Sequence, residues 1–192
     1  METTSTRHNV SEKQASIDGL LVDGWFDLHA LLGRFALQVG AVARSTGKFI
    51  EVTISKQTPR YFSGDNLRLI DVLNNVAAYA LSHLDEGCIL FNIDAYPIKQ
   101  CKYRIDIVVV TTGVGIPYHR VNAVYLPDYN RSGQSGNSLF VAKTIASLMG
   151  GDLTIENTFG WGTRYLVHLI MESEVPEHPI HSKHSITTGC VA

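Results

Sequence analysis

A glycine turn at residues 111–116 has the residue types that a ligand-binding loop needs. Its sequence is Thr-Thr-Gly-Val-Gly-Ile, and it follows directly on the aliphatic run 105–110. Glycine lacks a Cβ and adopts backbone angles that other residues disfavour, so Gly113 and Gly115 allow the backbone to approach a bound group closely. The pattern predicts a strand that ends in a ligand-binding turn, with Thr111 able to offer a hydroxyl to the ligand.

Three amphipathic helices are predicted around this turn. The first begins after Asp27, a suitable N-cap, and ends at Gly47, and the second begins after Asp65. The third precedes Gly150 and Gly151. Between helices, apolar or alternating runs predict five strands, at 48–55, 88–93, 101–110, 152–157 and 163–171.

The grouping of these elements predicts an α/β fold. We expect a two-layer sandwich, with about three helices packed on one face of a mixed, mainly antiparallel five-stranded sheet. Residues 94–100 are expected to join two antiparallel strands, and 59–63 to form a connection. The segment 117–137 has few periodic apolar positions, and a loop of that length in a compact domain is usually functional, such as a lid, or mobile.

Composition limits the classes of partner. The net charge is -2 over 192 residues, which gives no electrostatic reason to expect nucleic acid or direct membrane contact. No apolar run approaches the roughly 20 residues that cross a bilayer. The three cysteines lack ligand spacing, which favours a reduced, cytoplasmic setting. If the chain serves a membrane receptor, we expect the anchor in another part of that protein or in a partner. The histidines at 178, 181 and 184 are expected in a solvated tail rather than at a metal.

The order of five motifs resembles one family. Gly-Asp at 64–65 opens a helix with paired asparagines at 74–75, followed by the glycine turn, Ser-Gly-Asn-Ser at 135–138, Gly-Gly at 150–151 and Gly-Trp-Gly-Thr at 160–163. Together they resemble the ATP-binding catalytic domain of sensor histidine kinases, of the Bergerat-fold (GHKL) ATPase superfamily. The resemblance implies three parts: a leader and linker end at 1–25, the ATPase-like domain at 26–171 and a disordered tail or linker at 172–192.

The resemblance also places the nucleotide pocket and shows where this chain departs from it. The implied pocket positions are Asn75, Tyr79, Thr111, Gly113, Gly115, Gly136 and Thr163. Tyr79 stands where the family has the asparagine that ligates Mg²⁺, and Thr111 where it has the aspartate that accepts from the adenine amine. Ser82 replaces a basic residue and Ser138 a glycine. An alternative register would make Asn75 the metal ligand and Asp71 an acid, because the two lie one helical turn apart.

These departures favour a degenerate domain without catalytic or metal-binding residues, and no bound cofactor is expected. Such a domain would serve as a regulatory or docking module in a two-component phosphorelay. Its partners would be a response regulator or phosphotransfer domain and the dimerisation helices of the same or another protein. The alternative is an active kinase domain that binds ATP and Mg²⁺ and transfers the γ-phosphoryl group to a histidine elsewhere. A third hypothesis is a small-molecule sensor.

Overall fold

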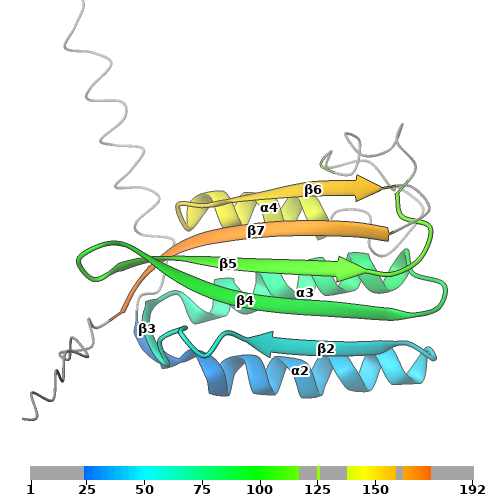
Figure 1. Cartoon of the computed structure of the whole chain (residues 1–192), viewed down its shortest axis with the longest axis horizontal. Helices are drawn as coiled ribbons and strands as arrows, with labels where there is room; N and C mark the ends of the chain where they lie inside the picture. The colour runs from blue at the N-terminus through cyan, green and yellow to red at the C-terminus, as the bar shows by residue number, and fades with distance from the viewer. Residues whose placement is uncertain (1–23, 117–124, 126–137, 159–161, 174–192) are drawn as a thin grey trace, which may run out of the picture.

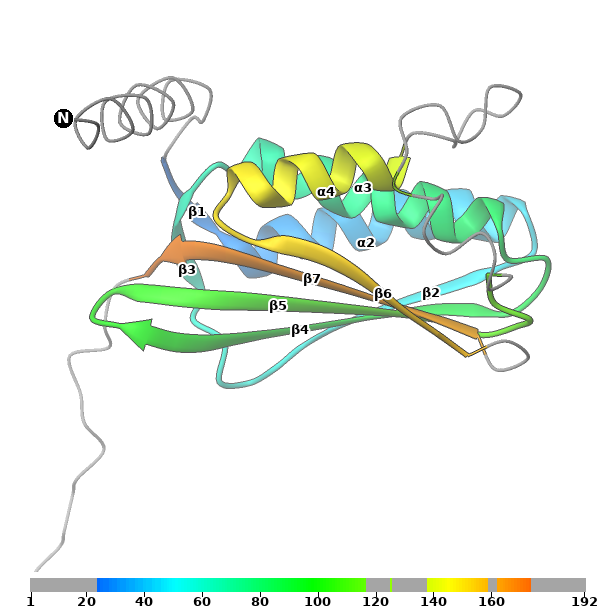
Figure 2. The same cartoon turned by 90° about the horizontal axis from the view of Figure 1, so that it is seen from above.

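The computed structural model describes residues 24–116, 125, 138–158 and 162–173. Within these ranges, three helices cover one face of a seven-stranded sheet, and none of the described helices lies on the opposite face (Figures 1 and 2). The helices are α2 (Leu28–Ser45), α3 (Asn66–Ser82) and α4 (Ser138–Leu148). The strands are β1 (Gly24–Asp27), β2 (Phe49–Ile54), β3 (Tyr61–Gly64), β4 (Cys88–Lys99), β5 (Lys102–Thr111), β6 (Asp152–Thr158) and β7 (Gly162–Glu172).

The sheet is mixed and mainly antiparallel, as the sequence predicts. The strand order is β1-β3-β7-β5-β4-β2, and β2 pairs with β4 in parallel while the other pairs are antiparallel. Strand β5 pairs with one edge of β7. The other edge of β7 pairs with β6 along residues 162–168 and with β3 at Glu172. The predicted two-layer α/β sandwich is therefore confirmed.

The two predicted N-caps are both present. The carboxylate of Asp27 accepts the Ala30 backbone N–H at 2.9 Å, and that of Asp65 accepts the Arg68 N–H at 2.9 Å. These bonds satisfy backbone donors that the first turn of a helix leaves without an intrahelical partner. At the other end of α2, Gly47 adopts a φ of +72°, which the chain needs in order to leave the helix.

Asp27 makes the start of α2 sensitive to acid. The Ala30 hydrogen bond, together with Arg60, whose Nε donates to the carboxylate at 2.8 Å, lowers the pKa of Asp27 below its usual value near 3.8. A lowered folded-state pKa adds stability above the unfolded pKa, and this contribution is lost as pH falls through the folded value. We expect urea midpoints at pH 6 and pH 3 to differ less in Asp27→Asn than in the parent, because asparagine caps without titrating. An equal fall in both proteins would contradict this expectation.

The core lies between the helices and the inner face of the sheet. Alternate residues of the central strands, among them Ile105, Ile107 and Val109, are at most 1% exposed. They pack against the buried stripe of α3, which includes Leu69 and Leu73. The inward-facing side chains recur at every second residue of the strands and about every 3.6 residues of the helix, and together they form one apolar layer.

The predicted strand count was wrong, because the sheet has seven strands rather than five. Strands β1 and β3 have four residues each and pair with one another from Gly24↔Gly64 to Asp27↔Tyr61. Segment 59–63 is thus partly a strand rather than only a connection. Four-residue strands are too short to show alternation, and their pairing depends on a contact across more than 30 residues.

The connection predicted at 94–100 also differs. Strand β4 continues to Lys99 and pairs with β5 along this stretch, with a register shift between Pro97 and Lys99. The proline is tolerated because β2 ends its pairing with β4 at Ile93, so that β4 is an edge strand beyond that point.

Strand β7 continues to Glu172, and Ser173 after it is bonded to two other segments. The Ser173 backbone N–H donates to the Cys101 carbonyl at 2.8 Å, and its hydroxyl donates to the Tyr61 carbonyl at 2.8 Å. Residues 1–23 of the predicted leader (1–25) and 174–192 of the predicted tail (172–192) lie outside the described residues, so the three-part division remains a prediction. In the described ranges, no helix combines the length and the apolar character that crossing a membrane requires.

Candidate functional site

The predicted pocket positions come from three elements that meet at one end of the molecule. Asn75 and Tyr79 lie one turn apart in the second half of α3, Thr111 ends β5 and Thr163 lies at the start of β7. Gly113 and Gly115 follow β5. Gly136 lies outside the described residues, as do Gly133 and Gly160.

Thr111 uses its hydroxyl within the sheet. It is the register partner of Thr163, and only 6% of it is exposed. Its Oγ1 donates to the Thr163 carbonyl at 3.3 Å and accepts the Thr163 backbone N–H at 3.2 Å. The proton of the hydroxyl is therefore already donated to the protein, and the residue carries no charge with which to attract a ligand amine.

Tyr79 is part of the aromatic core. It is 1% exposed, its ring stacks on His83 with centroids 4.0 Å apart, and it meets Tyr165 of β7 edge to face at 6.2 Å. Burial raises the pKa of the Tyr165 phenol, and the neighbouring Tyr79 raises it further, so Tyr165 is neutral at physiological pH. Edge-to-face aromatic pairs add roughly 0.5–1.5 kcal/mol beyond the burial of their area.

The polar groups around Tyr79 are bonded locally. The Ser82 hydroxyl donates to the Tyr79 carbonyl at 2.8 Å, and His83 Nδ1 lies 3.0 Å from the same oxygen. Asn75 Nδ2 donates to the Asp71 carbonyl at 2.8 Å. The amide nitrogen of Asn75 is therefore already hydrogen-bonded within its own helix.

The glycine turn is held by contacts within the protein. Gly113 and Gly115 have φ values of +108° and +78°, which L side chains rarely adopt. The backbone N–H of Thr112 donates to the Cys88 carbonyl at 3.1 Å, and its Oγ1 accepts the Cys88 N–H at 3.1 Å. The two glycines therefore have backbone angles that favour glycine, and the start of β4 holds Thr112 at the beginning of the turn.

At the two positions that the resemblance assigns to Mg²⁺ and to adenine, the side chains differ from the amide and carboxylate that it implies. Mg²⁺ requires compact oxygen ligands at about 2.0–2.1 Å in octahedral geometry, and position 79 offers a phenol buried between His83 and Tyr165. Position 111 offers a hydroxyl bonded to the backbone in place of a carboxylate. Within the described residues, no cluster of three or more His, Cys, Asp or Glu side chains could hold a metal ion.

Several residues of this region were not among the predicted site residues. His83 stands four residues after Tyr79, a spacing that places both on one face of the helix. Tyr165 belongs to the inward set of β7. Lys143 of α4 forms an ion pair with Asp152, donates to the Leu153 carbonyl at 2.8 Å and lies 5.1 Å from the Tyr125 ring centroid. Burial raises the pKa of Tyr125 to about 12.

Comparison with known proteins identifies the family. The family described as "Histidine kinase-, DNA gyrase B-, and HSP90-like ATPase" matches residues 64–173. This match covers more than half of the chain, and the chain therefore belongs to that family.

The curated relatives are much longer proteins. The chain is 30% identical over 140 residues to "Hybrid signal transduction histidine kinase F" of Dictyostelium discoideum, covering 66% of this chain and 12% of that protein. It is 29% identical over 123 residues to "Sensor histidine kinase RcsC" of Escherichia coli K12, covering 60% and 12%. The chain thus spans about an eighth of these relatives.

Solved structures share the fold. The chain of full-length ShkA, crystallised in complex with AMPPNP, superposes with a TM-score of 0.68 at 22% identity, covering 81% of this chain and 33% of that one. The mycobacterial sensor histidine kinase MprB superposes with a TM-score of 0.61 at 22% identity, covering 79% and 99%.

Proposed function

We propose that this chain is a histidine-kinase-type ATPase domain that has lost catalysis and acts as a regulatory or docking module in a two-component phosphorelay. Family membership and the relatives, which are named as sensor and hybrid histidine kinases, support the signalling role. The loss of catalysis rests on one observation, the burial of Tyr79 at the position where the family has its metal ligand.

The substitutions act on different parts of the same reaction. Phosphoryl transfer depends almost entirely on positioning and on neutralisation of phosphate charge, so it is sensitive to the metal ligand at position 79. At position 111, replacement of a charged acceptor forfeits a contact of roughly 1.5–3 kcal/mol. Ser82, in place of a basic residue, removes a phosphate contact. One change could be compensated. The three together weaken the binding of the metal ion at position 79, of adenine at position 111 and of phosphate at position 82.

The retained scaffold is what such a module would offer to partners. The helices, the sheet and the glycine turn are stabilised by contacts within the protein, so the surface persists without nucleotide. We propose a response regulator or phosphotransfer domain as one partner, and the dimerisation helices of the same or another protein as the other. In this proposal the domain positions these partners relative to one another.

Calorimetric titration of Mg-ATP tests the proposal. We expect no saturable heat for the parent protein, which corresponds to a Kd weaker than about 1 mM. Tight binding that requires Mg²⁺ and disappears in Gly113→Val would overturn the proposal, since that substitution blocks the glycine turn. Titration without Mg²⁺ distinguishes metal-assisted binding from weak adenine binding.

A double reversion provides the matched comparison. Tyr79→Asn with Thr111→Asp restores both family residues, and we expect it to gain Mg-dependent ATP binding. Circular dichroism establishes that the variant is folded, and a rise in its Tm with Mg-ATP reports binding independently of heat. Phosphorylation by the parent of a supplied dimerisation domain would show instead that the chain is an active kinase.

A further inference from the structure

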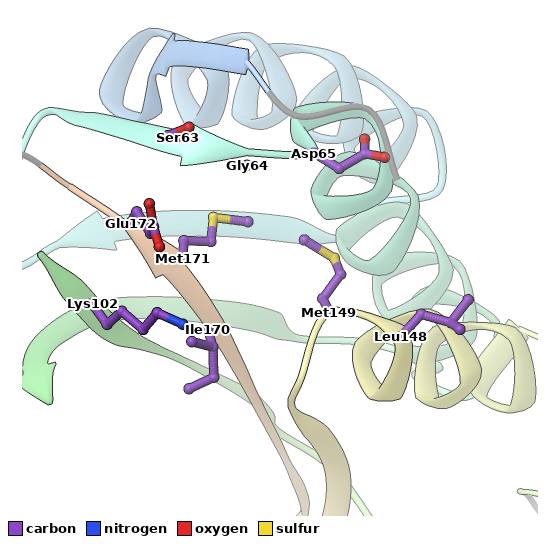
Figure 3. Close-up of a pocket in the computed structure, with 9 residues that line it drawn as sticks. All are labelled: Ser63, Gly64, Asp65, Lys102, Leu148, Met149, Ile170, Met171 and Glu172. Atoms are coloured by element: carbon purple, nitrogen blue, oxygen red, sulfur yellow. The ribbon is translucent and has the colours of Figure 1, made fainter. Parts of the chain in front are cut away.

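A pocket lies at a break in the strand pairing along β7. Strand β6 begins its pairing with β7 at Asp152↔His168, and β3 pairs with the same edge only at Ser63↔Glu172. Residues 169–171 therefore have no strand partner on that edge. We call the resulting pocket the β7 notch; its lining residues are Ser63, Gly64, Asp65, Lys102, Leu148, Met149, Ile170, Met171 and Glu172 (Figure 3).

The β7 notch is separate from the nucleotide-pocket positions. It lies where α3 and β5 begin, whereas Tyr79 and Thr111 lie toward the ends of the same two elements. Its volume is about 250 Å³. This is somewhat below the ~300–1,000 Å³ of pockets that hold drug-sized molecules, and it indicates a smaller ligand.

One part of the β7 notch is apolar and adaptable. Met149 and Met171 are 6% and 3% exposed, and their methyl ends point toward one another across the pocket (Figure 3). Leu148 and Ile170 also line the pocket, with Ile170 on the face of β7 opposite to Met171 because successive residues of a strand point to opposite faces. Thioether side chains are flexible and polarisable, so they fit an apolar chain of variable shape.

The other part carries two opposite charges. Lys102 and Glu172 are register partners on β5 and β7, yet the ion pairs among the described residues include neither of them. The Asp65 carboxylate caps α3 and points away from the pocket (Figure 3). A ligand with both a carboxylate and an ammonium group would complement the Lys102 and Glu172 side chains together.

We propose that the β7 notch binds a small zwitterion of the α-amino-acid class with an unbranched apolar side chain. The carboxylate would contact Lys102, the ammonium group would contact Glu172, and the side chain would lie between Met149 and Met171. Because both charged residues are exposed, each ionic contact adds little, and the expected Kd is about 0.1–1 mM. This proposal does not depend on the proposed signalling function.

Methionine-methyl NMR gives a direct test. The chain has three methionines, at positions 1, 149 and 171, so ¹³C-methyl labelling places two of its three probes in the β7 notch. With L-norleucine as the probe ligand, we expect saturable shifts of the Met149 and Met171 signals and none at Met1. Hexanoate and pentylamine each lack one charge and should bind at least about threefold more weakly, given the modest worth of exposed ion pairs.

Charge variants assign the contacts. Lys102→Met and Glu172→Gln should each raise the Kd for norleucine at least about threefold, whereas Lys56→Met and Glu51→Gln, which remove the same charges away from the notch, should leave it unchanged. The absence of saturable shifts up to about 10 mM norleucine would overturn the proposal. Equal binding of hexanoate, or equal weakening by the control variants, would also overturn it.

Discussion

Replacement of Tyr79 by alanine should lower the free energy of unfolding by about 3–5 kcal/mol, the range for truncating a large buried aromatic side chain. The Tyr79 ring is 1% exposed and contacts both His83 and Tyr165, so its removal leaves a cavity between α3 and the sheet. Urea unfolding followed by circular dichroism measures the change, provided that the m-value stays constant. In a kinase with a polar pocket at this position, the same change would cost far less.

Two further tyrosine variants separate ring from hydroxyl and core from surface. Tyr79→Phe keeps the ring and isolates the contribution of the hydroxyl. Tyr96→Ala is the surface control, because Tyr96 is 49% exposed and its ring contacts the Arg104 guanidinium at 5.6 Å. We expect the control to lose about 1 kcal/mol or less. A loss of that size in Tyr79→Ala would mean that the ring does not support the core.

Alanine at Gly162 should destabilise the fold by about 3 kcal/mol or more. Gly162 has a φ of +116°, and a Cβ at this position would lie 2.0 Å from the Thr111 carbonyl oxygen. The backbone conformation costs an L residue roughly 1–3 kcal/mol, and relief of the clash requires β5 and β7 to separate. The loss is expected without nucleotide, in the same urea experiment.

Gly47 supplies the control for Gly162. It also has a positive φ, +72°, but an added Cβ there meets nothing within 4 Å. Gly47→Ala should therefore show only the backbone cost, and the difference between the two variants measures the close approach of β5 and β7. Equal losses of unfolding free energy in Gly162→Ala and Gly47→Ala would show that the close approach of β5 and β7 does not contribute to the cost. The close approach identifies Gly162 as a residue that the sheet requires whether or not a nucleotide binds.

Features that depend on neighbours along the chain could be predicted from the sequence alone. Helix periodicity, the caps at Asp27 and Asp65 and the turn at Gly47 predicted all three helices, because these signals arise within one or two turns. Alternation predicted the five longer strands in the same way. The ordered motifs predicted the family, and their departures at Tyr79 and Thr111 identified the two positions on which the functional proposal rests.

The contacts that those residues make depend on the three-dimensional fold and could not be predicted from the sequence. Tyr79 meets Tyr165 across 86 positions of sequence, and the Thr111 hydroxyl bonds to a backbone 52 positions away. The pairing of β1 with β3 and the β7 notch likewise arise from segments far apart in the chain. Such contacts depend on how whole elements pack and register, and the local pattern of side chains carries no information about their partners.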